Sequence, residues 1–210
     1  MNIQSLYNRI SPWFRRRRMA QFLETVRPSG QTEVLDIGGY PWVWAQAGVP
    51  FPVLVINVDV PPGLERYEPQ FRTRRGDARR LEFADRSFEV AYSNSVIEHL
   101  STWENQQAFA QEARRVARKL WIQTPARSFP IEPHLIAPFV HWFSQGVQRH
   151  LLRWCTVWGW LTRPTREQVR AFLAEVRLLT FREMQQLFPD CQIIRERLFG
   201  LTKSYIAVRT

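Results

Sequence analysis

Two apolar runs, each with an aspartate near its end, constrain the fold of this chain most strongly. They are Glu33-Val34-Leu35-Asp36-Ile37-Gly38-Gly39 and Pro52-Val53-Leu54-Val55-Ile56-Asn57-Val58-Asp59. An apolar run that leads into glycines is typical of a buried strand followed by a tight loop, which can approach a ligand because glycine has no Cβ. Asp59 follows Asp36 by 23 residues. This fits nucleotide-binding βαβ units, where an acid at the tip of the second strand accepts hydrogen bonds from ribose hydroxyls. We therefore expect the chain to bind a nucleoside-containing cofactor.

Strand and helix patterns alternate over most of the chain, which favours a parallel α/β sheet. Periodicity predicts helices at 13–27 and 103–117, one helical turn near 42–48, and a short helix that begins at 180–183. The predicted strands lie at 33–38, 53–58, 71–75, 88–93 and 119–124, with a final antiparallel pair at 192–198 and 204–209. On the first helix, Arg15–Arg18 are expected on the face opposite the apolar residues Trp13, Met19, Phe22, Leu23 and Val26.

Size and charge narrow the class of protein. At 210 residues the chain can bury a substantial core, and we interpret residues 1–210 as a single domain. Its net charge of +10 comes from 29 basic residues, of which two are lysines and 27 are arginines. Such a surface suits phosphates, nucleic acids or anionic lipids, but a GC-rich genome also favours arginine codons, so charge alone leaves both interpretations open. Two cysteines without metal spacing, no signal-peptide pattern and no apolar run near the ~20 residues of a membrane span predict a cytoplasmic protein.

Two further motifs follow in order, Gly76-Asp77-Ala78-Arg79-Arg80-Leu81 and Asn94-Ser95-Val96-Ile97-Glu98-His99-Leu100. With the two aspartate-bearing runs, they resemble the landmarks of class I S-adenosylmethionine-dependent methyltransferases, in particular a small bacterial branch with a Glu-His-Leu signature. The resemblance covers about residues 30–125 and the two C-terminal strands. It implies a doubly wound, Rossmann-like, seven-stranded mixed sheet with a C-terminal antiparallel strand pair. An N-terminal helical segment (1–29) and an aromatic acceptor-lid insert after strand five (126–170) complete the expected domain.

The resemblance also implies S-adenosylmethionine as the cofactor and assigns its contacts. Asp36 would accept from the cofactor ammonium or hold a water, and Asp59 would accept from both ribose hydroxyls. Asp77 would accept from the adenine amino group, beside a donating Ala78 amide. The remaining cofactor-binding candidates are Gly38, Gly39, Ser93 and Asn94.

Tyr40-Pro41 departs from the glycine pattern of the family. Proline disfavours the helical region for the residue before it, so Tyr40 should be extended. Either Tyr40 folds over the cofactor as a lid, or binding at this loop is weaker than in the family.

Three residues are candidates for acid–base work during methyl transfer: His99, Glu132 and His134. His99 follows Glu98 just past the fourth strand, and histidine titrates near neutral pH. Glu132 and His134 lie in the insert, which in this fold builds a lid over the strand ends. For each of them a purely structural role in capping, packing or a turn is the competing interpretation.

The other two histidines, His141 and His150, are interpreted as packing or surface residues. No histidine or cysteine has the spacing of a metal-binding motif, so no metal is expected. The insert also carries a run of aromatic and aliphatic residues interleaved with arginines: Trp142, Phe143, Leu151, Leu152, Trp154, Trp158, Trp160 and Leu161, with Arg149, Arg153 and Arg163. This combination suits the headgroup boundary of a bilayer, and the alternatives are an apolar lid packed on the domain or a dimer contact.

The function expected from these motifs is transfer of a methyl group from S-adenosylmethionine to a small-molecule or lipid-linked acceptor, through an O- or N-nucleophile. An RNA methyltransferase is the first alternative because of the charge. It is disfavoured because the chain has no Asn/Asp-Pro-Pro-aromatic run and no recognisable RNA-binding module. A non-catalytic S-adenosylmethionine-binding protein is the second alternative, prompted by Tyr40-Pro41. The expected location is the cytoplasm, with peripheral contact at the inner membrane face left open, as is the oligomeric state.

Overall fold

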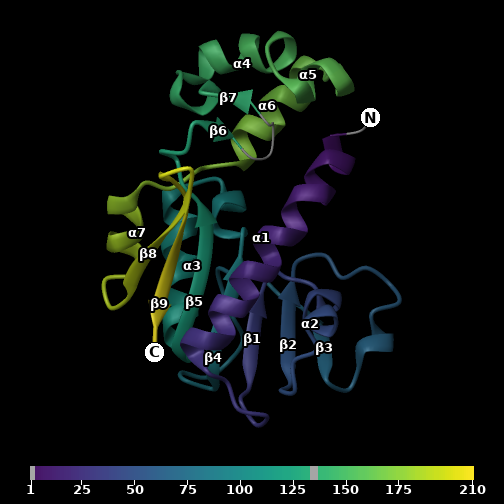
Figure 1. The fold of residues 1–210 in the computed structure, drawn as a ribbon, viewed down its shortest axis with the longest axis vertical. Helices are drawn as coiled ribbons and strands as arrows, with labels where there is room; N and C mark the ends of the chain where they lie inside the picture. Colours follow the sequence, from purple (N-terminus) through teal and green to yellow (C-terminus); the bar gives the residue numbers. More distant parts are fainter. Residues whose placement is uncertain (1–2, 133–136) are drawn as a thin grey trace.

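A computed structural model describes residues 3–132 and 137–210 of the chain, with side chains from Trp13 onward. Within these residues, seven strands form one sheet in the order β3-β2-β1-β4-β5-β9-β8 (Figure 1). Strands β1 to β5 are parallel, and β9 runs antiparallel to both β5 and β8. The strands are β1 (Val34–Ile37), β2 (Val53–Asn57), β3 (Phe71–Arg75), β4 (Phe88–Asn94), β5 (Ala117–Pro125), β8 (Gln192–Leu198) and β9 (Leu201–Arg209). The predicted mixed sheet and its C-terminal antiparallel pair are confirmed.

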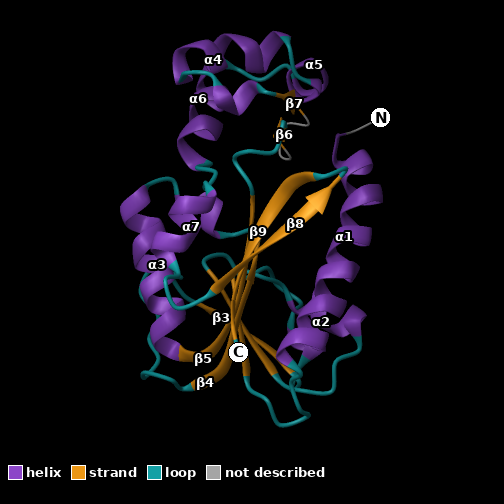
Figure 2. Ribbon diagram, turned by 60° about the vertical axis from the view of Figure 1, so that its left-hand side comes forward, coloured by secondary structure: helices purple, strands orange, loops and turns teal. Residues whose placement is uncertain are grey.

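Helices cover both faces of the sheet (Figure 2). Helices α1 (Ile3–Val26) and α2 (Pro41–Ala47) lie on one face, and α3 (Trp103–Val116) and α7 (Phe181–Leu187) lie on the other. Phe22 of α1 is fully buried and makes edge contacts with the rings of Tyr92 in β4 and Trp121 in β5. Burial of a large aromatic ring stabilises such an arrangement by roughly 1.5–3 kcal/mol. This first core, between α1 and the sheet, therefore fixes α1 across the middle of the sheet.

The second core forms under α3, whose boundaries follow from its sequence. The Thr102 side chain accepts from the Asn105 amide and caps the first turn. Phe109, Ala113 and Val116 are buried, as their spacing predicts. Two 3-10 turns, η1 (Glu65–Tyr67) and η2 (Ile97–Leu100), lie in the loops after β2 and β4.

The insert after β5 folds into a small layer of its own at the carboxyl edge of the parallel strands (Figure 1). It contains β6 (Ile131–Glu132), β7 (Ala137–Pro138), η3 (Val140–Trp142), α4 (Gln145–Trp154), α5 (Val157–Thr162) and α6 (Arg166–Glu175). Its apolar cluster consists of Ala137, Val140, Leu152 and Val169, with Trp158, Phe172 and Leu173 packed against them. Gly159 is needed where α5 crosses α4, because a Cβ there would lie 2.2 Å from the Leu152 carbonyl oxygen. None of the described helices combines the length and apolar character of a membrane span.

One prediction for α1 is wrong. Arg18 was expected on the solvated face with its neighbours, yet only 6% of it is exposed, while Arg16 remains exposed. The physical reason is Glu196 of β8, whose carboxylate lies 3.1 Å from both Nε and Nη2 of Arg18. A buried guanidinium is tolerated only with such a charge-assisted partner and further acceptors.

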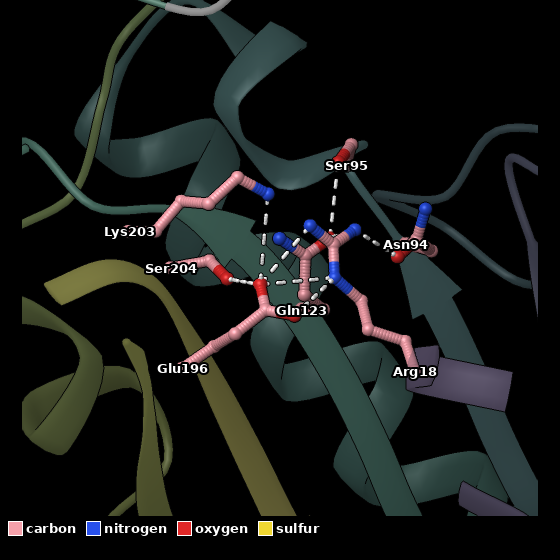
Figure 3. Close-up of polar contacts among 7 residues, drawn as sticks. All are labelled: Arg18, Asn94, Ser95, Gln123, Glu196, Lys203 and Ser204. Carbon is pink, nitrogen blue, oxygen red and sulfur yellow. Dashed lines mark hydrogen bonds and ion pairs between the residues drawn. The ribbon is translucent and has the colours of Figure 1, made fainter. Parts of the chain in front are cut away.

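These further acceptors lie at the ends of β4 and β5 (Figure 3). Nη1 of Arg18 donates to Asn94 Oδ1 at 2.9 Å and to Gln123 Oε1 at 3.1 Å. On the other side of Glu196, Ser204 donates to its carboxylate and the Lys203 ammonium lies 3.8 Å away. Burial and the neighbouring guanidinium lower the pKa of Lys203 to about 8, against the opposing effect of Glu196. This network joins α1, the two central strands and the C-terminal hairpin.

Replacement of Arg18 should show how strongly this network holds the fold. Arg18→Met leaves the Glu196 carboxylate buried without its main partner, which typically costs about 3–5 kcal/mol in the free energy of unfolding. The matched change Arg16→Met, on the exposed face of the same helix, should stay within about 0.5 kcal/mol. Urea unfolding of both variants measures the difference. The double variant Arg18→Met/Glu196→Met should regain part of the loss, and equal stability of the two single variants would contradict a structural role for the network.

Candidate functional site

The loop after β1 requires both of its glycines. Gly38 has φ of +84°, and a Cβ there would lie 2.6 Å from a methyl carbon of Val96. A Cβ on Gly39 would lie 1.9 Å from Oδ2 of Asp36. Asn57 at the end of β2 holds the loop, because its Nδ2 donates to the carbonyl oxygens of Gly38 at 3.4 Å and Gly39 at 3.2 Å. Asn57 was not among the site residues predicted from sequence, although it directly precedes Val58-Asp59 at the end of a predicted strand.

Asp36 lies directly against this loop and is 2% exposed. Its Oδ2 accepts a hydrogen bond of 2.8 Å from Trp44 Nε1 of α2. Its Oδ1 is buried without a hydrogen-bond partner among the described residues. Burial raises the pKa of Asp36 to about 7, and the Trp44 bond opposes the shift. A buried carboxylate oxygen beside a glycine loop fits the ammonium of S-adenosylmethionine, which would satisfy this oxygen and favour its charged form.

The next two predicted acids lie farther along the same edge of the sheet. Asp59 is exposed, and its amide donates to Asn57 Oδ1 at 3.4 Å, so one side chain connects the glycine loop to the ribose candidate. Asp77 follows β3 and pairs with Arg79 at 2.7 Å, which lowers the pKa of its carboxyl. Ala78 is half-buried beside the core under α3.

A pocket of about 320 Å³ opens beside Asp77. Ile56, Leu81 and Phe83 supply apolar walls, and Gly76 supplies a wall without a side chain. Arg74, Arg75, Arg80 and Glu82 complete the lining, so the pocket combines apolar walls with several charged groups. A carboxylate beside apolar walls suits a flat heterocycle whose exocyclic amine donates a hydrogen bond. For Asp77 to accept from such an amine, its pairing with Arg79 would have to loosen.

The remaining predicted cofactor residues serve visible structural roles. Ser93 is fully buried and donates from Oγ to the Ile37 carbonyl at 2.8 Å, which joins β4 to β1. Asn94 accepts from Arg18, so its carbonyl oxygen is already engaged. Tyr40 is extended as predicted, with φ −143° and ψ 141°, and its ring stacks on Trp42 at 4.2 Å between centroids. Contacts of these residues with the cofactor stay predictions.

The side chains of Glu98 and His99, which are neighbours in η2, contact different parts of the molecule. Glu98 is fully buried, and its Oε2 accepts from Thr124 Oγ1 of β5 at 2.9 Å. His99 is partly exposed, and its Nδ1 lies 3.2 Å from the Glu175 carboxylate of α6. The pair therefore joins the sheet to the insert. The catalytic role of His99 stays a prediction.

A second pocket, of about 260 Å³, lies under the insert, and we call it the lid pocket. Its polar lining comprises Arg127, Glu132, His141, Gln145, Gln148 and Arg177, and its apolar lining includes Val140, Phe143, Phe172 and Leu173. Glu132 is 2% exposed. His134, the third catalytic candidate, lies outside the described residues.

His141 was interpreted from sequence as a packing or surface residue, but it lines the lid pocket together with Glu132. Its Nε2 lies 3.0 Å from the Arg127 carbonyl, which can only accept, so Nε2 carries the proton and Nδ1 is the basic nitrogen. Burial is the main cause that lowers the pKa of His141, and it favours the neutral form of the ring. No local sequence pattern predicts that His141 and Glu132 line the same pocket, because η3 and β6 are brought together only by the fold of the insert.

The raised pKa of Asp36 predicts a pH-dependent contribution to stability. The folded protein keeps a proton on this carboxyl up to about pH 7, whereas the unfolded chain releases it near pH 4. This contribution to the free energy of unfolding is therefore complete below pH 4 and is lost as the pH rises to about 7. Asp36→Asn cannot titrate, so its stability relative to the wild type should rise by a few kcal/mol between these limits. Urea unfolding of both proteins across the range measures this, and a difference independent of pH would contradict the assignment.

Comparison with known proteins adds to this geometry. Residues 43–120 match a family described as a methyltransferase domain. No curated protein matches the sequence significantly. Among solved structures, magnesium protoporphyrin IX methyltransferase from Synechocystis PCC 6803 with bound SAH is 13% identical, with a TM-score of 0.61, covering 100% of this chain and 89% of that one. The PH0226 protein from Pyrococcus horikoshii OT3 is 16% identical, with a TM-score of 0.56 and coverage of 90% and 85%. Phosphoethanolamine N-methyltransferase 2 from Haemonchus contortus is 14% identical, with a TM-score of 0.57 and coverage of 85% of this chain and 38% of that one.

At these identities the solved structures show a shared fold. The family match falls on the stretch from α2 to β5, which carries the ribose candidate, the adenine candidate and the Glu98-His99 pair. The match, the fold and the buried acceptor at the glycine loop together support a methyltransferase enzyme with S-adenosylmethionine as its cofactor.

Proposed function

We propose that this chain transfers a methyl group from S-adenosylmethionine to a small-molecule or lipid-linked acceptor, through an O- or N-nucleophile, and that the acceptor binds in the lid pocket. The observation that carries this proposal is that a buried acid, Glu132, and the imidazole of His141 line the same pocket. That pocket lies in the layer that follows β5, at the carboxyl edge where ligands of open α/β sheets bind. Membership of the small bacterial branch with the Glu-His-Leu signature is part of the proposal.

The cofactor would lie along the edge formed by the loops after β1, β2 and β3. Asp36 would accept from its ammonium, Asp59 from its ribose hydroxyls, and Asp77 from its adenine amine, with the main chain of Gly38 and Gly39 in close approach. When bound, S-adenosylmethionine supplies a methyl group that is electrophilic because it is attached to a positively charged sulfur.

The residues of the lid pocket would position the acceptor and take its proton. A hydroxyl or amine that becomes methylated must lose a proton, and His141 in its neutral form would accept that proton at Nδ1. Glu132 can accept a hydrogen bond from the nucleophile and orient it. The aromatic and aliphatic walls exclude water, which strengthens both interactions and keeps the reacting atoms in line.

Loss of the ribose contact should weaken cofactor binding without a change in fold. Hydrogen bonds to a charged group contribute about 1.5–3 kcal/mol, so Asp59→Ala should raise the dissociation constant for S-adenosylmethionine about tenfold or more. Glu167→Ala removes an exposed acid from α6 and serves as the control. Calorimetric titration measures both. An Asp59→Ala variant with wild-type affinity would remove the ribose assignment.

The acceptor site is tested by Glu132→Gln, which retains size but loses the charge. We expect turnover to fall at least tenfold while affinity for S-adenosylmethionine is unchanged, because the proposal places Glu132 against the acceptor and not against the cofactor. The assay incubates the protein and labelled cofactor with an extract of the native host, separates RNA, lipid and small-molecule fractions, and identifies the labelled product by mass. Glu167→Gln is the matched control. Label confined to RNA, or full turnover by Glu132→Gln, would contradict the proposal.

A further inference from the structure

The outer surface of the insert exposes large apolar side chains beside the start of α1. We define the docking face by five residues: Trp13, Trp154, Val157, Trp160 and Leu161. Trp154 and Trp160 are 68% and 70% exposed, Trp13 is 56% exposed, and Val157 and Leu161 are 41% and 50% exposed. Tryptophans exposed to this extent are unusual in a soluble domain unless they contact a partner, because each leaves a large apolar area in water.

Trp154, Val157, Trp160 and Leu161 lie together on one surface, and Trp13 lies on a helix that approaches it. Val157, Trp160 and Leu161 are spaced i, i+3 and i+4, so they share one side of α5. The indole of Trp160 donates to the main-chain carbonyl of Trp154, which brings the two tryptophans together. Helix α1, which carries Trp13, passes close to α5, and the figures show its N-terminal end beside this helix (Figures 1 and 2).

Charge is distributed unevenly along the chain, and the docking face falls in its acid-free parts. All 19 acidic residues lie in 24–132 and 167–196, so the segments 1–23 and 133–166 contain none. These same segments hold nine arginines: Arg9, Arg15, Arg16, Arg17, Arg18, Arg149, Arg153, Arg163 and Arg166. The Arg153 guanidinium lies 5.3 Å from the centre of the Trp154 ring. Arg18 is buried in its ion pair with Glu196, and the other eight arginines make the segments that carry the docking face strongly basic.

We propose that the docking face binds the surface of an anionic lipid bilayer. Tryptophan side chains favour the headgroup boundary because one ring edge is polar and the rest is apolar. Arginines near an anionic leaflet are attracted to its surface potential, and their flexible stems let the guanidinium reach the headgroups while apolar neighbours insert. The short helix α5 would lie in the interface plane.

A second copy of the chain fits this surface less well. A twofold dimer places the same patch against itself, so the acid-free, arginine-bearing surfaces would face each other and repel. The docking face also differs from the residues proposed for methyl transfer. Its failure in an experiment is therefore distinguishable from failure of the enzymatic proposal.

The test is sedimentation of the full chain with vesicles of phosphatidylcholine alone or mixed with phosphatidylglycerol. We expect binding to the mixed vesicles, at least tenfold weaker binding to phosphatidylcholine alone, and loss of binding as salt is raised. The double variant Trp154→Ser/Trp160→Ser should bind mixed vesicles at least tenfold more weakly. The matched control is Phe199→Ser, which removes a side chain that is 94% exposed on the β8–β9 turn, and it should bind like the wild type.

Two further measurements keep the outcome decisive. Wild-type affinity for S-adenosylmethionine in the double variant shows that the domain is folded. Ultracentrifugation and titration with single-stranded RNA, each with wild type and double variant, test the other occupants. The proposal is overturned if the wild type does not bind anionic vesicles, or if Phe199→Ser loses as much binding as the double variant. It is also overturned if the two tryptophans support only self-association or only RNA binding.

Discussion

The buried ion pair between Arg18 and Glu196 connects segments that lie 178 residues apart in the chain. It draws the N-terminal helix onto the sheet and ties the C-terminal hairpin to it. Through Asn94 and Gln123 the same guanidinium reaches the carboxyl ends of β4 and β5. A buried guanidinium needs several acceptors, and no single element supplies them all. The position of α1 therefore depends on the complete sheet.

At the glycine loop after β1, the fold buries the carboxyl group of Asp36, which costs free energy when that group is charged. Asp36 is buried against Gly39 with one oxygen bonded to Trp44 and the other without a partner among the described residues. The free protein holds a carboxyl that titrates near neutrality, and a cationic ligand group would convert this cost into binding energy. Gly39 allows the carboxylate so close to the loop, and Asn57 keeps the loop in position. If Asp36 accepts from the cofactor ammonium, as we propose, stability and cofactor recognition are linked through one side chain.

The insert serves two surfaces at once. Its inner side forms the lid pocket, which is lined by Glu132 and His141 among others, and its outer side exposes Trp154 and Trp160. Glu98 and His99 connect the sheet to this layer through Thr124 and α6. If the outer side rests on a membrane, as we propose, the lid pocket lies in the same small layer that contacts the lipid. A lipid-linked acceptor could then reach it with little exposure of its apolar part to water.

Much of the fold followed from local pattern. The strands, α3 and the glycine loop were predictable because apolar periodicity, a capping threonine and positive-φ glycines act within a few residues of one another. The residues predicted to bind ribose and adenine, Asp59 and Asp77, also came from local sequence, because each acid lies just after a strand. The tertiary structure alone decided that Arg18 is buried, that His141 and Glu132 line one pocket, and that Asn57 holds the glycine loop in place. Each of these contacts joins residues whose partners are set by the packing of separate elements, and the energy of a buried charge or hydrogen bond depends on that packing rather than on neighbours in the sequence.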